Sequence, residues 1–162
     1  MPSSRRPHSQ GFTLIELMVA VVIAAIVAAI AYPAYTKQMQ RGRRAGAVAA
    51  LTAVMQSQER YRSNHSSYAT TLTDLGGDIS SITSNYSVSD PTGVVPLAGG
   101  LPDPKIGYVA TATPTSTGKQ TGDKTCKSFT VEMRGGTATY SAKGDPNNTG
   151  TDGDTTADCW PK

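Results

Sequence analysis

The chain has 162 residues, which leaves room for one modest domain in addition to an N-terminal segment and excludes several large cores. Its formal charge of +3 would fall to +1 if the first eleven residues, with Arg5 and Arg6, were removed, so net charge indicates no class of partner. Composition divides the chain into an apolar, helix-favouring front and a turn-rich, strand-favouring part after Asn64.

The front is dominated by sixteen consecutive apolar residues, from Leu17 to Tyr32. With its flanks the run reaches about 24 residues and about 36 Å, enough to cross a bilayer. A secretory signal peptide is the first alternative, but the run is longer than a usual signal core and the helical pattern continues beyond it. A simple transmembrane anchor is the second alternative. Such an anchor would not require Glu16, because inserting an acidic side chain into a membrane helix costs about 2.5 to 3.5 kcal/mol.

The stretch GFTLIE, from Gly11 to Glu16 behind a short basic leader, resembles the signature of type IV pilins. The resemblance implies that a prepilin peptidase cuts after Gly11 on the cytoplasmic side and methylates the new terminus at Phe12. Residues 1–11 would then be a removed leader, and residues 12–35 a transmembrane and fibre-core helix. A residue without Cβ before the cut also lets a protease approach the backbone closely.

A processed chain would give Glu16 a partner, because the Phe12 amine keeps its positive charge after methylation. The amine and Glu16 lie about one turn apart in one helix, and in a bundle the amine of one subunit could meet Glu16 of its neighbour. The resemblance implies the second pairing, with Phe12, Thr13 and Glu16 as assembly residues. An unpaired carboxylate in an apolar core costs about 3 to 5 kcal/mol, so Glu16 would fix the register. The alternative is an acid that reaches the headgroups from near the helix end.

Two features give opposite predictions for orientation. The basic cluster that follows the apolar run would place the C-terminal side in the cytoplasm by the positive-inside rule; it comprises Lys37, Arg41, Arg43 and Arg44. Cys126 and Cys159, in a turn-rich domain, instead indicate a disulfide formed outside the cytoplasm. A zinc site is the weaker alternative, because the cysteines lack the spacing typical of zinc ligands. We expect a single-pass inner-membrane protein with its head outside the cytoplasm, and an extracellular fibre after assembly. The basic cluster itself could face lipid headgroups, contact neighbouring subunits or, least favoured, bind nucleic acid.

Residues 36–63 predict an amphipathic outer half of the same helix, with Val48, Leu51 and Met55 on one stripe. Pro33 removes one backbone hydrogen bond and should kink or loosen the helix near Ala29. The resemblance implies local loss of helix there on assembly.

The globular head spans residues 64–162 and begins with a loop. Four strands are predicted, at residues 85–89, 108–113, 128–133 and 137–141, with a two-residue hairpin turn at Gly135 and Gly136. Residues 90–105, rich in proline and glycine, predict a surface excursion. We therefore expect an α+β fold, in which a long N-terminal helix packs on a four-stranded antiparallel sheet.

The head also resembles a narrower group, the minor pilins of the E type and similar competence pilins. The resemblance is carried by YATTLTDLG, GYVATATP, GDKTCKSFTVEMRGG and the final DCW. It implies that the region bounded by Cys126 and Cys159 is exposed and often adhesive.

The C-terminal segment raises two binding hypotheses. Its oxygen-bearing side chains suit calcium in type, as in secretion pseudopilins, but their spacing is not that of an EF-hand and a solvated turn is favoured; they are Asp145, Asn147, Asp152, Asp154 and Asp158. Nearby lysines could contact DNA, although interleaved aspartates weaken the positive potential; they are Lys119, Lys124, Lys127 and Lys143.

Catalytic motifs are absent from the sequence, so neither an enzyme nor a cofactor is predicted. The favoured function is a structural subunit of a type IV pilus that supports adhesion, motility or DNA uptake. Its expected partners are other pilin subunits, the prepilin peptidase, the pilus assembly platform and the inner membrane. The alternatives are a DNA-binding or adhesive competence pilin at the pilus tip, and a type II secretion pseudopilin.

Overall fold

A computed structural model describes residues 11–76 and 84–161 of the chain. Most of the leader and part of the predicted loop after Asn64, residues 1–10 and 77–83, lie outside the described residues. The chain divides into two compact units, residues 1–39 and 40–162, and helix α1 (Leu14–Arg62) contributes to both.

The first unit contains the apolar part of α1. Every residue from 14 to 35 is exposed, although this part holds most of the large apolar side chains of the helix. By length and composition α1 could cross a membrane. Pro33 lies inside the helix, and the Thr36 hydroxyl donates a hydrogen bond to the Pro33 carbonyl at 2.9 Å. The predicted kink stays a prediction.

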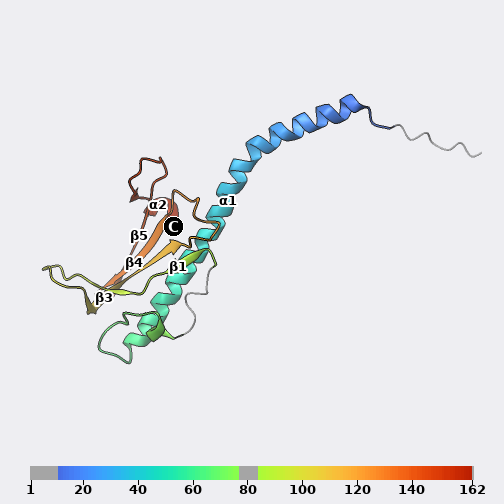
Figure 1. Cartoon of the computed structure of the whole chain (residues 1–162). Coiled ribbons are helices and arrows are strands. Elements are labelled where there is room, and N and C mark those ends of the chain that lie inside the picture. Colours follow the sequence, from blue (N-terminus) through green and yellow to red (C-terminus); the bar gives the residue numbers. More distant parts are fainter. Residues whose placement is uncertain (1–10, 77–83, 162) are drawn as a thin grey trace, which may run out of the picture. The chain divides into compact units, whose positions relative to one another are not determined.

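The second unit is built on an antiparallel sheet of six strands (Figure 1). The strands are β1 (Tyr86–Val88), β2 (Thr92–Val94), β3 (Asp103–Pro114), β4 (Ser128–Arg134), β5 (Thr137–Gly144) and β6 (Gly153–Asp154). Their order is β1-β3-β4-β5-β6, and β2 also pairs with β3. A short 3-10 helix η1 (Thr73–Leu75) and a short helix α2 (Thr156–Cys159) complete the unit.

The prediction of four strands was wrong in number, because β2 and β6 are additional. β2 lies in the segment predicted as a surface excursion, and the same segment contains the first residues of β3. Three residues after Pro91 cannot display a period of two, so β2 has no sequence pattern. β6 has only Gly153 and Asp154, which pair with the end of β5.

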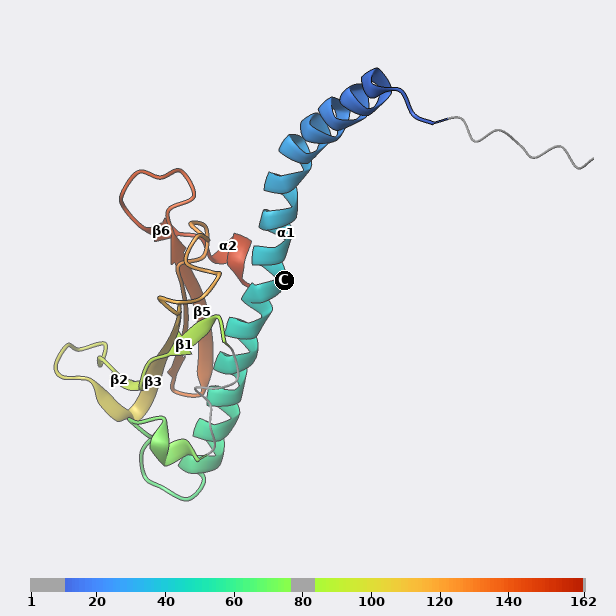
Figure 2. The same cartoon turned by 45° about the vertical axis from the view of Figure 1, so that its right-hand side comes forward.

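The part of α1 that belongs to the second unit lies along one face of the sheet, as both views show (Figures 1 and 2). The hydrophobic core lies between them. In β4 the burial alternates, with Phe129, Val131 and Met133 inside. Leu51 and Val54 of α1 are fully buried, while Val48 and Met55 of the predicted stripe are only partly buried. The β4–β5 turn at Gly135 and Gly136 has positive φ at both residues, as a two-residue hairpin requires.

Candidate functional site

The predicted assembly residues form a reciprocal cap at the start of α1. The Thr13 hydroxyl accepts a hydrogen bond from the Glu16 backbone N–H at 3.3 Å, and the Glu16 carboxylate accepts from the Thr13 backbone N–H at 3.3 Å. The Thr13 hydroxyl also donates to that carboxylate at 3.2 Å. This is a capping box, which satisfies backbone donors that a helix leaves open. In the uncleaved chain Glu16 is therefore bound by Thr13, while Phe12 is exposed.

The basic cluster after the apolar run is split by the fold. Arg44 forms a bidentate ion pair with Asp123, with its Nε 2.7 Å from one carboxylate oxygen and its Nη2 2.9 Å from the other. This pair is largely withdrawn from solvent, since the Arg44 side chain is 12% exposed and that of Asp123 only 1%. Arg43 donates to the Lys119 carbonyl at 3.3 Å, and Arg41 remains exposed. Arg44 is thus a structural anchor, a role that the sequence pattern did not indicate.

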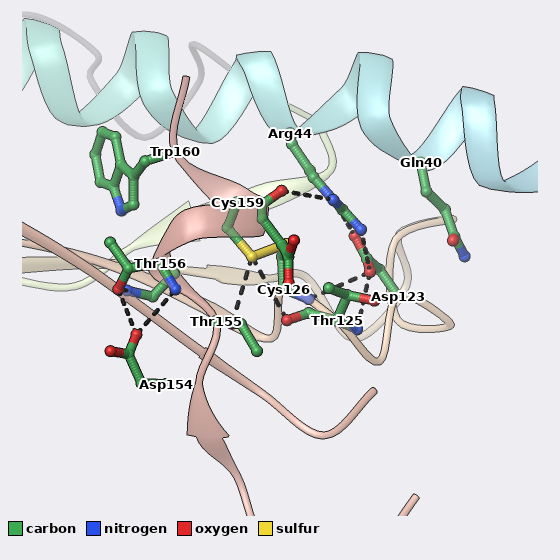
Figure 3. Close-up of a disulfide and its surroundings, with 12 residues drawn as sticks. Gln40, Arg44, Asp123, Thr125, Cys126, Asp154, Thr155, Thr156, Cys159 and Trp160 are labelled. Atoms are coloured by element: carbon green, nitrogen blue, oxygen red, sulfur yellow. Dashed lines mark hydrogen bonds and ion pairs between the residues drawn. A yellow bond between two sulfur atoms is a disulfide. The ribbon is translucent and has the colours of Figure 1, made fainter. Parts of the chain in front are cut away.

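Asp123 also holds the loop that leads to the disulfide (Figure 3). Its carboxylate accepts hydrogen bonds from Gln120 Nε2 at 2.7 Å and from the backbone N–H groups of Thr125 and Cys126 at 3.1 and 3.2 Å. Arg44 Nη1 reaches across to the Asp158 carbonyl at 3.3 Å. One arginine therefore ties both segments that carry the cysteines to α1.

Cys126 and Cys159 form the disulfide that the sequence predicted. Both are buried, and the bond links the loop that precedes β4 to α2. Trp160 follows directly; its indole N–H donates to the Ser141 carbonyl at 2.8 Å, and its ring packs edge to face on Phe129. The disulfide thereby fixes the C-terminal segment beside the core.

Two of the carboxylates considered for calcium, those of Asp145 and Asp154, accept hydrogen bonds from nearby residues of the C-terminal segment. Asp145 accepts from the backbone N–H groups of Thr149 and Gly150 at 2.8 and 2.7 Å, and these bonds lower its pKa. Asp154 accepts from the Thr156 N–H and hydroxyl, which lowers its pKa too. Across residues 11–76 and 84–161, no three His, Cys, Asp or Glu side chains gather as metal ligands would.

Three of the four predicted DNA-contact lysines lie in adjoining segments. The Lys127 N–H donates to the Lys143 carbonyl at 2.9 Å, and Lys124 is close in the chain. Two are engaged, because Lys127 Nζ lies 2.6 Å from Asp152 Oδ1 and Lys124 Nζ donates to Asn148 Oδ1 at 2.8 Å. Lys119 is exposed on the loop before Gln120. Their charge is thus partly balanced by the aspartates of the same region.

A second basic site, which sequence reasoning missed, surrounds a cleft of about 540 Å³. We call it the cationic cleft; its lining residues are Arg62, Tyr68, Pro96, Leu97, Lys105, Ile106, Arg134, Gly135 and Gly136. The cations come from the end of α1, from β3 and from the end of β4. The sequence pattern did not indicate them as a group, since they lie in three separate segments of the chain.

Fixed geometry holds two of these cations at the cleft. The Arg62 guanidinium lies 5.6 Å from the centre of the Tyr68 ring and donates to the His65 carbonyl at 2.8 Å. Arg134 donates to the Val95 carbonyl at 2.8 Å and pairs with Glu132 at 2.8 Å. In the part of the chain that the structure describes, Lys105 has no ion pair.

The loop beside the cationic cleft carries bare apolar side chains. Leu97 is 93% exposed and Leu101 is 86% exposed, in the connection between β2 and β3. Single exposed leucines are ordinary, but Leu97 lines the cleft together with the three cations, so this surface is both apolar and basic.

Comparison with known proteins places these features in a family. Residues 6–32 match the family described as the prokaryotic N-terminal methylation motif. Residues 33–130, more than half of the chain, match the family described as type IV minor pilin ComP, DNA uptake sequence receptor. No curated protein matches the chain significantly. The chain therefore belongs to the ComP family of type IV minor pilins.

Proposed function

We propose that the chain is cleaved between Gly11 and Phe12 by a prepilin peptidase, methylated at Phe12 and held in the inner membrane by residues 12–35. The head then lies outside the cytoplasm, and the pilus assembly platform moves the subunit into the fibre. The match of residues 6–32 to the methylation motif supports the processing, and the Cys126–Cys159 disulfide supports the location of the head.

The N-terminus of purified protein tests the processing step. Mass spectrometry of chain from sheared fibres and from membranes should find a terminus at N-methylated Phe12. Gly11→Ser should leave the uncleaved chain in the membrane, because the added side chain obstructs the approach of the protease to the backbone. Normal cleavage of this variant would count against the peptidase assignment.

We further propose that the head binds duplex DNA during uptake, and that the cationic cleft is the contact surface. The observation that carries this proposal is the convergence of Arg62, Lys105 and Arg134 on one hollow. Arginine and lysine bind phosphates, and neutralising each phosphate releases counterions. Leu97 and Leu101 add an apolar contact of the kind that inserts between base steps in some DNA complexes.

The lysine set near the disulfide is the competing surface. Lys127 is already paired with Asp152, and Asp145 and Asp154 lie in the same loop region. At the cationic cleft the single ion pair is Arg134 with Glu132, and Lys105 is free of one among the described residues. We therefore favour the cationic cleft, where one of the three lining cations is in an ion pair among the described residues, as the contact for a phosphate backbone.

The two surfaces are separated by matched variants of the full chain in detergent. One variant combines Arg62→Gln, Lys105→Gln and Arg134→Gln; the other replaces Lys119, Lys124, Lys127 and Lys143 by Gln. Binding to duplex DNA is measured over a range of salt concentrations. We expect the cleft variant to lose about tenfold or more in affinity and to lower the salt slope by about 2 to 3.

The possible results decide between the surfaces. Loss confined to the lysine variant would move the contact to the disulfide region. Unchanged binding in both variants would reject both surfaces, and no binding by the unmodified chain would reject DNA recognition by this subunit. Intact disulfide and circular dichroism establish that each variant is folded.

A further inference from the structure

An apolar groove runs between α1 and the C-terminal segment of the head. It consists of two hollows of about 420 and 440 Å³ that share Val48, Trp160 and Pro161, so they form one continuous feature. Along α1 the groove extends from Arg41 to Thr52, which is about 16 Å or three helical turns. We call it the C-terminal groove. Figure 3 shows Trp160 beside the helix that forms its other wall.

Several polar groups in the walls of the groove are bound within the protein, although the lining also includes the charged side chains of Arg41 and Asp158. The Thr52 hydroxyl donates to the Val48 carbonyl at 2.8 Å, and the Trp160 indole N–H donates to the Ser141 carbonyl at 2.8 Å. The Thr156 hydroxyl donates to Asp154 at 2.6 Å and accepts the Ala142 N–H at 2.9 Å. The groove therefore offers mainly carbon surface, which favours an apolar occupant.

One wall of the groove contains an aromatic ring held by its neighbours, and the other contains short side chains. The Trp160 ring is held between Phe129 and Tyr140, at centroid distances of 5.8 and 4.8 Å. On the α1 side the exposed residues Ala45 and Ala49 have short side chains. Short side chains let another helix approach closely, and fixed walls lower the entropy that its binding would cost.

The part of α1 that precedes the groove carries the exposed apolar side chains. In α1 every residue from 14 to 35 is exposed, and the groove begins at Arg41, six positions after Tyr35. If subunits were displaced along a common fibre axis, the apolar helix of one subunit would pass beside a later part of α1 in another. The groove thus lies on the same helix as the exposed apolar residues 14–35.

We propose that the C-terminal groove receives the apolar N-terminal helix, residues 12–35 or their equivalent, of a neighbouring pilin subunit in the fibre. The proposal rests on the proposed assembly of this chain into a pilus. A nucleic acid fits the groove poorly, because Arg44 is already paired with Asp123 and Asp158 contributes a carboxylate to the lining. Residues Ala49 and Trp160 would lie at the contact.

Cross-linking in cells tests the occupant. A photoreactive phenylalanine analogue is placed at Ala49 in the groove or, as a control, at Gln56, which is exposed on the same helix outside it. We expect position 49 to give adducts that map to residues 12–35 of a pilin subunit, and position 56 to give none there. Adducts of position 49 with a neighbour's head, or equal yields at both positions, would overturn the proposal.

Blocking the groove gives an independent readout. Ala49→Trp should reduce the amount of chain in sheared fibres by about tenfold or more, as for a central packed contact, while Gln56→Trp should leave it unchanged. Membrane levels and disulfide formation should be normal in both, since both positions are exposed. Normal incorporation of Ala49→Trp would overturn the groove assignment alone, whereas absence of the unmodified chain from fibres would overturn the assembly on which it rests.

Discussion

Asp123 organises the region around the disulfide by accepting five hydrogen bonds. Two come from Arg44, one from Gln120, and two from the backbone of Thr125 and Cys126. Bonds to a charged acceptor are stronger than neutral ones, and removing the carboxylate would leave a mostly buried cation and buried donors unpaired. This one side chain therefore positions both the disulfide loop and the α1 residues opposite it.

The first prediction concerns this buried pair. Asp123→Ala should lower the free energy of unfolding by about 3 to 5 kcal/mol, because it leaves Arg44 uncompensated. Lys127→Met is the control, because it removes an ion pair in which the Lys127 side chain is 42% exposed and the Asp152 side chain is 44% exposed. It should lower the free energy of unfolding by about 0 to 1 kcal/mol. Urea unfolding of the disulfide-intact chain measures both. Similar losses of stability in the two variants would show that the buried Arg44–Asp123 pair contributes no more to stability than the exposed Lys127–Asp152 pair.

A second residue-scale prediction concerns pH. The hydrogen bonds to Asp145 lower its pKa in the folded chain below the ordinary value of 3.8. A depressed pKa stabilises the folded state above the unfolded-state pKa, and this contribution is lost as pH falls through the folded-state pKa. We expect protection of the Thr149 and Gly150 amides from hydrogen exchange to decline below about pH 4. Asp145→Asn should remove that dependence, and an unchanged acid profile in the variant would contradict the assignment.

At the scale of elements, β3 pairs with β1, β2 and β4 and so connects most of the sheet. Gly107 lies in β3 opposite Arg134, beside the start of the β4–β5 turn. A Cβ at Gly107 would overlap the carbonyl oxygen of Met133, which is backbone and cannot rotate away. The close approach of β3 and β4 here depends on a glycine.

The prediction for this element is that Gly107→Ala destabilises the head by about 1 to 3 kcal/mol, because the strands must separate to admit the methyl group. Gly153→Ala, where an added Cβ has no neighbour within 4 Å, should change stability by less than about 0.5 kcal/mol. Thermal unfolding compares the two. Since Arg134 adjoins this site, Gly107→Ala should also weaken DNA binding, if the cationic cleft is the contact.

At the scale of the whole molecule, the chain combines an apolar helical segment, residues 14–35, in which every residue is exposed, and a second unit whose core is formed by the sheet and the later part of α1. Such a helix is stable only in a membrane or in a bundle of similar helices. Glu16 is bound by Thr13 in the uncleaved chain, and cleavage would create the Phe12 amine beside it. We expect the carboxylate to serve as a cap before assembly and as the register-fixing anion afterwards.

Glu16→Ala should therefore leave membrane insertion and cleavage intact while removing the chain from sheared fibres. Thr13→Val, which removes the capping hydroxyl but keeps the carboxylate, separates the two roles. If the register role holds, Thr13→Val should assemble far better than Glu16→Ala. Equal defects would assign the effect to the cap, and normal fibres from Glu16→Ala would refute the register role.

Local sequence determined much of this protein. The run Leu17–Tyr32 and the GFTLIE motif are continuous in the chain, so the apolar helix and the family could be predicted without a structure. The four predicted strands correspond to β1, β4 and parts of β3 and β5, and the clearest signal was the alternation at Phe129, Val131 and Met133, which directly reflects a strand with one buried face. β2 and β6 are held by pairing with β3 and β5 and are too short to show a pattern.

Tertiary structure decided what depends on distant residues. In the sequence, Arg44 is one of four cations that follow the apolar run. Only the fold brings Asp123, 79 positions later in the chain, next to it. Arg62, Lys105 and Arg134 share a cleft because the end of α1, the start of β3 and the end of β4 line it, and Ala49 and Trp160 line one groove although they are far apart in the chain. Periodicity and motifs report interactions between neighbours in the chain, whereas these surfaces arise from packing between separate elements, which a local pattern does not encode.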